Sequence, residues 1–163
     1  MGRQRKTFKK ESITVAFAIE QMRQTVGVPI RPLNSVDLES HLITESSLNR
    51  PGLALAGYVE LFTHHRVQLL GNTECRYLSH LSEDEQTTAF NNLLKFPIPC
   101  IILTEGNELD ERMIGLATNA GIPLFVTPTP TIQFMVQLRD FLGDQFALQQ
   151  SLHGSLIDVY GIG

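Results

Sequence analysis

With 163 residues and 18.2 kDa, the chain has the size of one ordinary domain with a single hydrophobic core. Apolar residues make up 42% and charged residues 18% of the chain, a composition that excludes an intrinsically disordered protein. No apolar run approaches the roughly 20 residues that span a bilayer, and the N-terminus lacks the apolar stretch of a signal peptide. We therefore expect a cytoplasmic protein with no membrane partner.

The charge is distributed unevenly. The first ten residues, MGRQRKTFKK, hold five of the 13 Lys and Arg residues and no acid, whereas the chain as a whole has a formal charge of -4. So short a basic run favours a solvated tail, which we assign to residues 1–11, over a nucleic-acid-binding arm. The acidic remainder of the chain also argues against a nucleic-acid partner.

The next segment predicts one helix and two short strands. SITVAFAIEQMRQTVGV has helical periodicity and ends at Gly27. Its apolar stripe consists of Val15, Ile19, Met22 and Val26. Short strands are expected near residues 28–30 and 41–44, followed by a turn at residues 49–52.

Strands and helices then alternate. HRVQLLG predicts a strand closed by Gly71, followed by a helix from residue 72 to about residue 81. Ser82 and Glu85 have the spacing of a capping box, which predicts a second helix. IPCIILTEG predicts a buried strand, and NELDERMIGLATNAG predicts a helix with Asn107 as its cap and Gly121 as its stop.

The last part of the chain continues this alternation. IPLFVT predicts a strand, and Thr129 or Thr131 can cap the helix that follows the turn PTPT. This helix has an apolar face formed by Phe134, Leu138, Phe141 and Leu142. SLIDVYG predicts a final strand. The order of elements predicts an α/β sandwich with a mixed, mostly parallel sheet flanked by helices, in a domain spanning residues 12–148.

Few residues suggest chemistry by themselves. A metal role for His64 and His65 is disfavoured, because adjacent side chains on a strand point to opposite faces and a third ligand is missing. Cys75 and Cys100 show no CxxC or Cys/His spacing and are expected to be reduced, structural thiols.

Acidic residues cluster after the predicted strand IPCIILTEG, at the sheet edge where α/β proteins bind ligands. The cluster consists of Glu105, Glu108, Asp110 and Glu111. The same residues suit the N-terminal end of a helix dipole, and we favour this structural role. The chain contains no G-x-S-x-G elbow, dinucleotide glycine fingerprint or G-x-x-x-x-G-K-[ST] phosphate loop, so we expect no bound cofactor. His153 precedes a glycine, which is typical of a surface or turn residue.

Four separated motifs nevertheless resemble one family, the HPr kinase/phosphorylases of bacteria. They are NRPGLALAGY, RVQLLGNTE, AGIPLF and LHGSLIDVYGIG, which begin at residues 49, 66, 120 and 152. The resemblance is continuous from about residue 43 to the last residue. It implies that the chain is the family's N-terminal domain, which is similar to the small substrate-binding domain of Mur ligases. Residues 149–163 would then be a lead-in strand to a missing C-terminal kinase domain.

The resemblance also implies an activity for the full-length protein. Such an enzyme phosphorylates a serine of HPr, a phosphocarrier of the sugar phosphotransferase system, with ATP and magnesium, in the control of carbohydrate metabolism. It also removes this phosphate with inorganic phosphate, which yields pyrophosphate. HPr would be a partner, and the protein would self-associate to a homo-oligomer such as a hexamer. His153 matches the family's active-site histidine, which would hold or polarise a phosphate oxygen or help to position the catalytic carboxylate.

Two interpretations remain open. In the first, the chain is a regulatory or assembly domain of this kinase/phosphorylase and is inactive alone, because it lacks the phosphate loop. In the second, it is a stand-alone, non-enzymatic module for effector binding or oligomerisation. The apolar ending LIDVYGIG favours the first, because a natural end is usually polar. A phosphate loop encoded within about a dozen residues downstream would decide between them.

Overall fold

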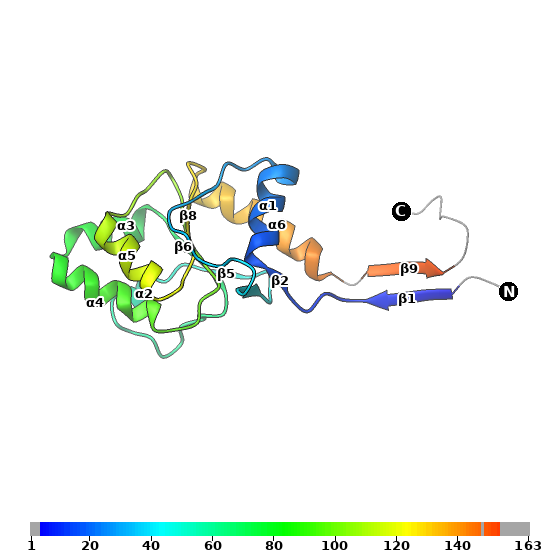
Figure 1. The fold of residues 1–163 in the computed structure, drawn as a ribbon, viewed down its shortest axis with the longest axis horizontal. Coiled ribbons are helices and arrows are strands. Elements are labelled where there is room, and N and C mark those ends of the chain that lie inside the picture. Colours follow the sequence, from blue (N-terminus) through cyan, green and yellow to red (C-terminus); the bar gives the residue numbers. More distant parts are fainter. Residues whose placement is uncertain (1–3, 148, 154–163) are drawn as a thin grey trace.

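The computed structural model describes residues 4–147 and 149–153, and Figure 1 shows the arrangement of its elements. In chain order these are β1 (Gln4–Phe8), β2 (Ile13–Thr14), α1 (Val15–Gln21), the π-helical turn η1 (Met22–Val26), β3 (Arg31–Pro32), β4 (Leu42–Ile43), β5 (Leu48–Asn49), α2 (Gly52–Leu55), β6 (Val67–Leu70), α3 (Asn72–His80), α4 (Glu83–Leu94), β7 (Ile101–Leu103), α5 (Glu111–Asn119), β8 (Leu124–Val126), α6 (Thr131–Phe146) and β9 (Gln149–His153).

A five-stranded sheet with the order β3-β8-β7-β6-β5 forms the centre of the fold. Strands β5, β6, β7 and β8 are parallel, and β3 pairs antiparallel with β8 at one edge. Every residue of β6, β7 and β8 is buried, as expected for parallel strands that are covered on both faces. The structure therefore confirms the predicted α/β class with a mixed, mostly parallel sheet.

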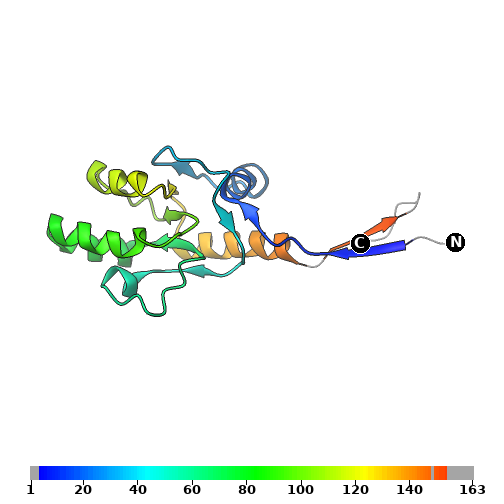
Figure 2. The ribbon, with the colours of Figure 1, turned by 60° about the horizontal axis from the view of Figure 1, so that its bottom comes forward.

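Helices cover both faces of this sheet and form two groups in Figures 1 and 2. On one face, α2, α3, α4 and α5 pack with Leu70, Ile101 and Leu103 in one core. On the opposite face, α1, η1 and α6 pack with Leu69 and Ile102 in a second core. Because successive strand residues point to opposite faces, each apolar strand contributes to both cores. None of the helices in the described part of the chain is long and apolar enough to cross a membrane.

The first predicted helix ends at Gly27, as expected, but its last turn is wider than an α-helix. Met22 is buried, whereas Val26, expected on the apolar stripe, is 36% exposed. The Gly27 N–H donates to the Met22 carbonyl, the spacing of a π-helical turn. The wider turn rotates Val26 off the buried face, and Gly27 ends the helix with φ of 84°.

The capping residue was predicted correctly for one helix and wrongly for another. Ser82 caps α4: its Oγ accepts from the Glu85 N–H at 3.2 Å, and the Glu85 carboxylate accepts from the Ser82 N–H at 3.0 Å. The prediction that Asn107 caps α5 is wrong, because that helix begins at Glu111. Asp110 is its cap and accepts from the Met113 N–H at 3.0 Å.

The segment before β6 also differs from the prediction. The strand expected near residues 41–44 is the short β4, whereas residues 28–30 form no strand and the short β3 follows them at Arg31–Pro32. The turn expected at residues 49–52 is wrong: β5 ends at Asn49, and α2 begins at Gly52. Pro51 precedes the first turn of α2 and accepts a hydrogen bond from the Leu55 N–H, so the Pro-Gly pair starts a helix here.

The two ends of the described chain form a two-stranded antiparallel ribbon. Strand β1 pairs with β9, with Gln4 opposite His153 and Phe8 opposite Gln149. Figures 1 and 2 show this ribbon extending away from the sheet and its helices. The sequence did not predict a strand at residues 4–8, whose backbone pairs with β9, and the basic tail at residues 1–11 stays a prediction. The final strand expected from SLIDVYG lies outside the described residues, and the domain boundaries at residues 12 and 148 stay predictions.

Candidate functional site

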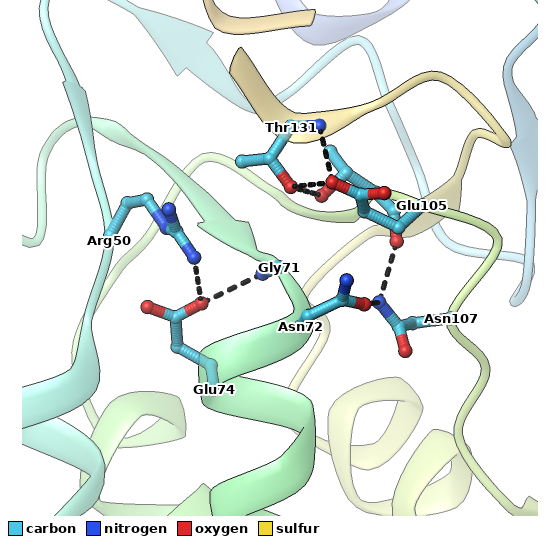
Figure 3. A network of polar contacts seen from close by, with 8 residues as sticks. Arg50, Gly71, Asn72, Glu74, Glu105, Asn107 and Thr131 are labelled. Atoms are coloured by element: carbon cyan, nitrogen blue, oxygen red, sulfur yellow. Dashed lines mark hydrogen bonds and ion pairs between the residues drawn. The ribbon is translucent and has the colours of Figure 1, made fainter.

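Polar residues gather where the parallel strands end. Strand β5 leads to Arg50, β6 to Gly71, β7 to Thr104 and Glu105, and β8 through its loop to Thr131. The carboxyl ends of parallel strands share one edge of the sheet, and open α/β sheets bind their ligands there. We call this group the edge network and define it by Arg50, Gly71, Asn72, Glu74, Thr104, Glu105, Asn107 and Thr131 (Figure 3).

Two loops of the edge network lead to helices on opposite faces of the sheet. The loop after β7 leads to α5, which packs on the face that also holds α2, α3 and α4. The loop after β8 leads to α6, which packs on the opposite face. Adjacent strands whose connections diverge in this way define the switch point at which ligand crevices form in α/β sheets. The fold therefore marks the carboxyl ends of β7 and β8 as the position for a site.

One half of the network consists of Arg50, Gly71 and Glu74. The Arg50 Nη2 lies 2.8 Å from the Glu74 Oε1, and the same oxygen accepts the Gly71 N–H at 2.8 Å. Glu74 is only 5% exposed, so its carboxylate is buried beside the N-terminus of α3, where a negative charge is stabilised. A Cβ on Gly71 would lie 2.6 Å from the Arg50 Nη2 and 2.8 Å from the Thr131 Oγ1. Gly71 therefore lets the two halves of the network approach each other.

The other half links Thr104, Glu105 and Thr131. The Glu105 Oε2 accepts the Thr131 N–H at 3.0 Å and the Thr131 hydroxyl at 3.2 Å. The Thr104 and Thr131 hydroxyl oxygens lie 2.6 Å apart. Since a carboxylate only accepts, Thr131 donates to Glu105, and Thr104 donates to Thr131. Glu105 thus caps α6 from the loop after β7, in place of the Thr129 or Thr131 cap that the sequence predicts.

The Glu105 backbone has an uncommon conformation. Its φ is 61°, in the left-handed region that non-glycine residues rarely adopt, and Gly106 follows with φ of 70°. Two backbone hydrogen bonds hold this turn against the β8–α6 loop, from the Glu105 N–H to Thr129 and from the Gly106 N–H to Thr127, both at 3.0 Å. Such strain persists where the surroundings fix it, often at functional sites.

Asn107 joins the two halves. Its Nδ2 donates to the Asn72 Oδ1 at 2.9 Å and to the Thr104 carbonyl at 2.8 Å (Figure 3). Asn107 therefore ties the loop after β7 to the first residue of α3. Both helix N-termini in the network, those of α3 and α6, already carry a carboxylate of the chain itself. The hydrogen bonds and the ion pair of the network thus fix the loops at the sheet edge.

The acidic residues that the sequence groups together separate in the structure. Glu105 caps α6, Asp110 caps α5, and Glu111 lies in the first turn of α5. These positions at helix N-termini confirm the favoured structural role for Glu105, Asp110 and Glu111. Within residues 4–147 and 149–153, no group of three or more His, Cys, Asp or Glu residues is arranged to hold a metal ion.

The other candidate residues lie apart from the network. His64 stacks on Phe96 with ring centroids 5.3 Å apart, whereas His65 contacts the Glu45 carboxylate. Both histidines precede β6 in a turn and not on a strand, and their rings lie edge to face with centroids 6.0 Å apart. Burial raises the pKa of the Cys100 thiol to about 12, and burial, followed by the Glu74 charge, raises that of Cys75 to about 12. Both thiols are free and protonated at neutral pH, which suits the predicted structural role.

His153 lies at the end of β9, opposite Gln4 of β1. Figure 1 shows β9 in the ribbon that leads away from the five-stranded sheet, far from the carboxyl ends of its strands. The structure does not bring this strand to the edge network. The catalytic role of His153 therefore stays a prediction.

Sequence reasoning missed Arg50, Glu74 and Gly71 as parts of one site. One signal was available: Arg50 comes directly after β5, and Gly71 and Asn72 come directly after β6, at the carboxyl ends of parallel strands. These residues share one edge even though Arg50 and Glu74 lie 24 positions apart in the chain.

Comparison with a solved structure supports the fold. The chain is similar to the crystal structure of the CBS and DRTGG domains from the regulatory region of Clostridium perfringens pyrophosphatase, complexed with the activator diadenosine tetraphosphate. The TM-score is 0.52 at 15% sequence identity, and the match covers 83% of this chain and 54% of the other. This likeness concerns the fold alone.

Sequence comparison shows the family. Residues 13–142 match the family described as the HPr serine kinase N terminus, and the chain belongs to this family. The chain is 50% identical to the HPr kinase/phosphorylase of Chlorobium phaeovibrioides and 48% identical to that of Chlorobaculum tepidum, each over all 163 residues. These matches cover 49% and 48% of the two relatives, so the chain spans about half their length.

Proposed function

We propose that the full-length protein containing this domain is a bifunctional HPr kinase/phosphorylase. It would phosphorylate a serine of HPr with ATP and magnesium and remove this phosphate with inorganic phosphate, in the control of carbohydrate metabolism. One observation carries the proposal: the whole chain matches about half the length of two proteins named HPr kinase/phosphorylase. We place the protein in the cytoplasm, where HPr would be its partner.

Within that protein, we assign a regulatory or assembly role to the domain described here. The edge network supports this role, because its hydrogen bonds and its ion pair fix the loops at the sheet edge. Self-association to a homo-oligomer such as a hexamer is part of the same proposal. His153 would be the domain's contribution to catalysis, because it matches the active-site histidine of the family that the chain resembles.

Nucleotide and magnesium would bind outside this chain. The sequence has no G-x-x-x-x-G-K-[ST] loop to cradle phosphates. In the described part of the chain, the acidic residues of the edge network accept hydrogen bonds at helix N-termini and leave no cluster suited to magnesium. The edge network therefore fits neither group, and we derive no catalytic step through them.

A paired phosphotransfer assay tests this proposal. The full-length protein, supplied with ATP and magnesium, should transfer phosphate to a serine of HPr, and the 163-residue chain alone should not. Mass spectrometry of HPr detects the product and locates the modified residue. A Ser→Ala variant of HPr at that residue is the matched control. Transfer by the isolated chain, or an inactive full-length protein, would overturn the proposal.

A further inference from the structure

A groove lies beside the switch point, at the carboxyl end of β8. Its volume is about 690 Å³, which falls within the range of about 300–1,000 Å³ typical of small-molecule sites. Val28, Ile30 and Val126 form apolar parts of its wall, and Arg23, Arg31 and Glu108 are its charged residues. We call it the β8 groove. An apolar wall with a few polar groups is the usual composition of a ligand pocket.

The two arginines of the β8 groove come from different elements. Arg23 is held in place by its Nε–H, which donates to the Ile30 carbonyl at 2.7 Å, while its Nη1 is 3.9 Å from Glu20. Arg31 lies on β3, opposite Val126 of β8. In the described part of the chain, the Arg31 guanidinium has no hydrogen bond or ion pair. Arg31 therefore has N–H donors available to an incoming anion. Arg23 lines the same groove and is held in place by its bond to Ile30.

The position of the groove within the fold agrees with this chemistry. Gly106 and Glu108 bring the loop after β7 to its wall, and Pro128 brings the loop after β8. These are the two loops that diverge to opposite faces of the sheet, so the groove occupies the crevice where α/β sheets bind ligands. The protein has a net charge of -4, yet the charged residues of the groove are two arginines and one glutamate. Arg23 is 3.9 Å from Glu20, whereas the Arg31 guanidinium has no ion-pair partner among the described residues, so Arg31 supplies the positive charge that complements an anion.

We propose that the β8 groove binds a small organic anion. Its phosphate or carboxylate group would pair with Arg23 and Arg31, and its apolar body would lie against Val28, Ile30 and Val126. Glu108 would accept a hydrogen bond from a hydroxyl or amino group of the ligand. Because Gly106 and Glu108 share a loop with Glu105, an occupant of the groove would contact the strained turn of the edge network. This inference is independent of the proposed phosphotransfer activity.

Anilinonaphthalene sulfonate, a fluorescent anion with an apolar aromatic body, is a suitable probe. Titration of the purified 163-residue chain should show saturable fluorescence that inorganic phosphate and benzoate reduce to different extents. The stronger competitor then indicates whether the ligand is a phosphate or a carboxylate. Arg31→Gln should weaken probe binding about tenfold, because a charged hydrogen-bond donor is lost. Glu108→Gln should tighten it about threefold, because the one carboxylate beside the anion is removed.

The controls are Arg139→Gln on α6 and Glu111→Gln on α5, both exposed and outside the groove lining. Both should bind the probe like the wild type, and circular dichroism should show that every variant is folded. Three results would overturn the inference: no saturable binding, unchanged binding by Arg31→Gln, or equal effects of Glu108→Gln and Glu111→Gln. The assay contains neither ATP nor HPr, so its failure leaves the proposed phosphotransfer untouched.

Discussion

Replacing Gly71 with alanine should lower the free energy of unfolding by about 2–3 kcal/mol. The new methyl group would lie 2.6 Å from the Arg50 Nη2 and 2.8 Å from the Thr131 Oγ1, closer than a Cβ can approach. If Arg50 moves, the buried Glu74 loses its ion-pair partner. If Thr131 moves, its hydrogen bonds with Glu105 and Thr104 are strained. Either displacement breaks part of the edge network.

Gly115→Ala is the matched control for this variant. Gly115 lies inside α5, and a Cβ there would meet nothing within 4 Å. Alanine favours a helix over glycine by about 1 kcal/mol, so this variant should be more stable than the wild type. Urea denaturation followed by circular dichroism measures both changes. A Gly71→Ala variant as stable as the wild type would show that the contacts among Arg50, Gly71 and Thr131 do not constrain the fold.

His153→Ala in the full-length protein should lower the rate of phosphotransfer to HPr about 100-fold, the usual effect of losing a group that holds a phosphate oxygen or transfers a proton. The N-terminal domain should remain folded, because His153 lies on β9, which pairs with β1 and lies outside the five-stranded sheet. Steady-state kinetics with saturating ATP measures the rate. Thermal unfolding followed by circular dichroism measures the fold.

Gln150→Ala serves as the control on the same strand, where Gln150 pairs with Thr7. Its phosphotransfer rate should match that of the wild type. If His153→Ala and Gln150→Ala turn over alike, the catalytic assignment of His153 is lost, whereas the family membership of the chain stands.

Much of the fold was predictable because its signals are local. The apolar runs at β6, β7 and β8, the capping box at Ser82 and the stop at Gly27 all involve residues close together in the chain. The predictions fail where residues distant in the chain determine the local structure. Residues 4–8 form a strand because their partner β9 lies near the opposite end of the chain. Asn107 does not cap α5, which begins only at Glu111, and its amide instead bonds Asn72, 35 positions away.

The candidate site was harder to predict for the same reason. The sequence placed the acidic residues at a sheet edge, but it did not show that Glu105 turns toward α6 or that Glu74 pairs with Arg50. Gly71 marked only the end of a strand, because its close contacts with Arg50 and Thr131 depend on the packing of three loops. The groove beside β8 likewise combines η1, β3 and two distant loops.

The most direct measurement of the proposed function uses the reverse reaction. The full-length protein is incubated with serine-phosphorylated HPr and radiolabelled inorganic phosphate, and the products are separated by thin-layer chromatography. A bifunctional kinase/phosphorylase should form labelled pyrophosphate while HPr loses its phosphate, and the isolated 163-residue chain should form none. Loss of phosphate from HPr without labelled pyrophosphate, or no loss with the full-length protein, would contradict the proposal.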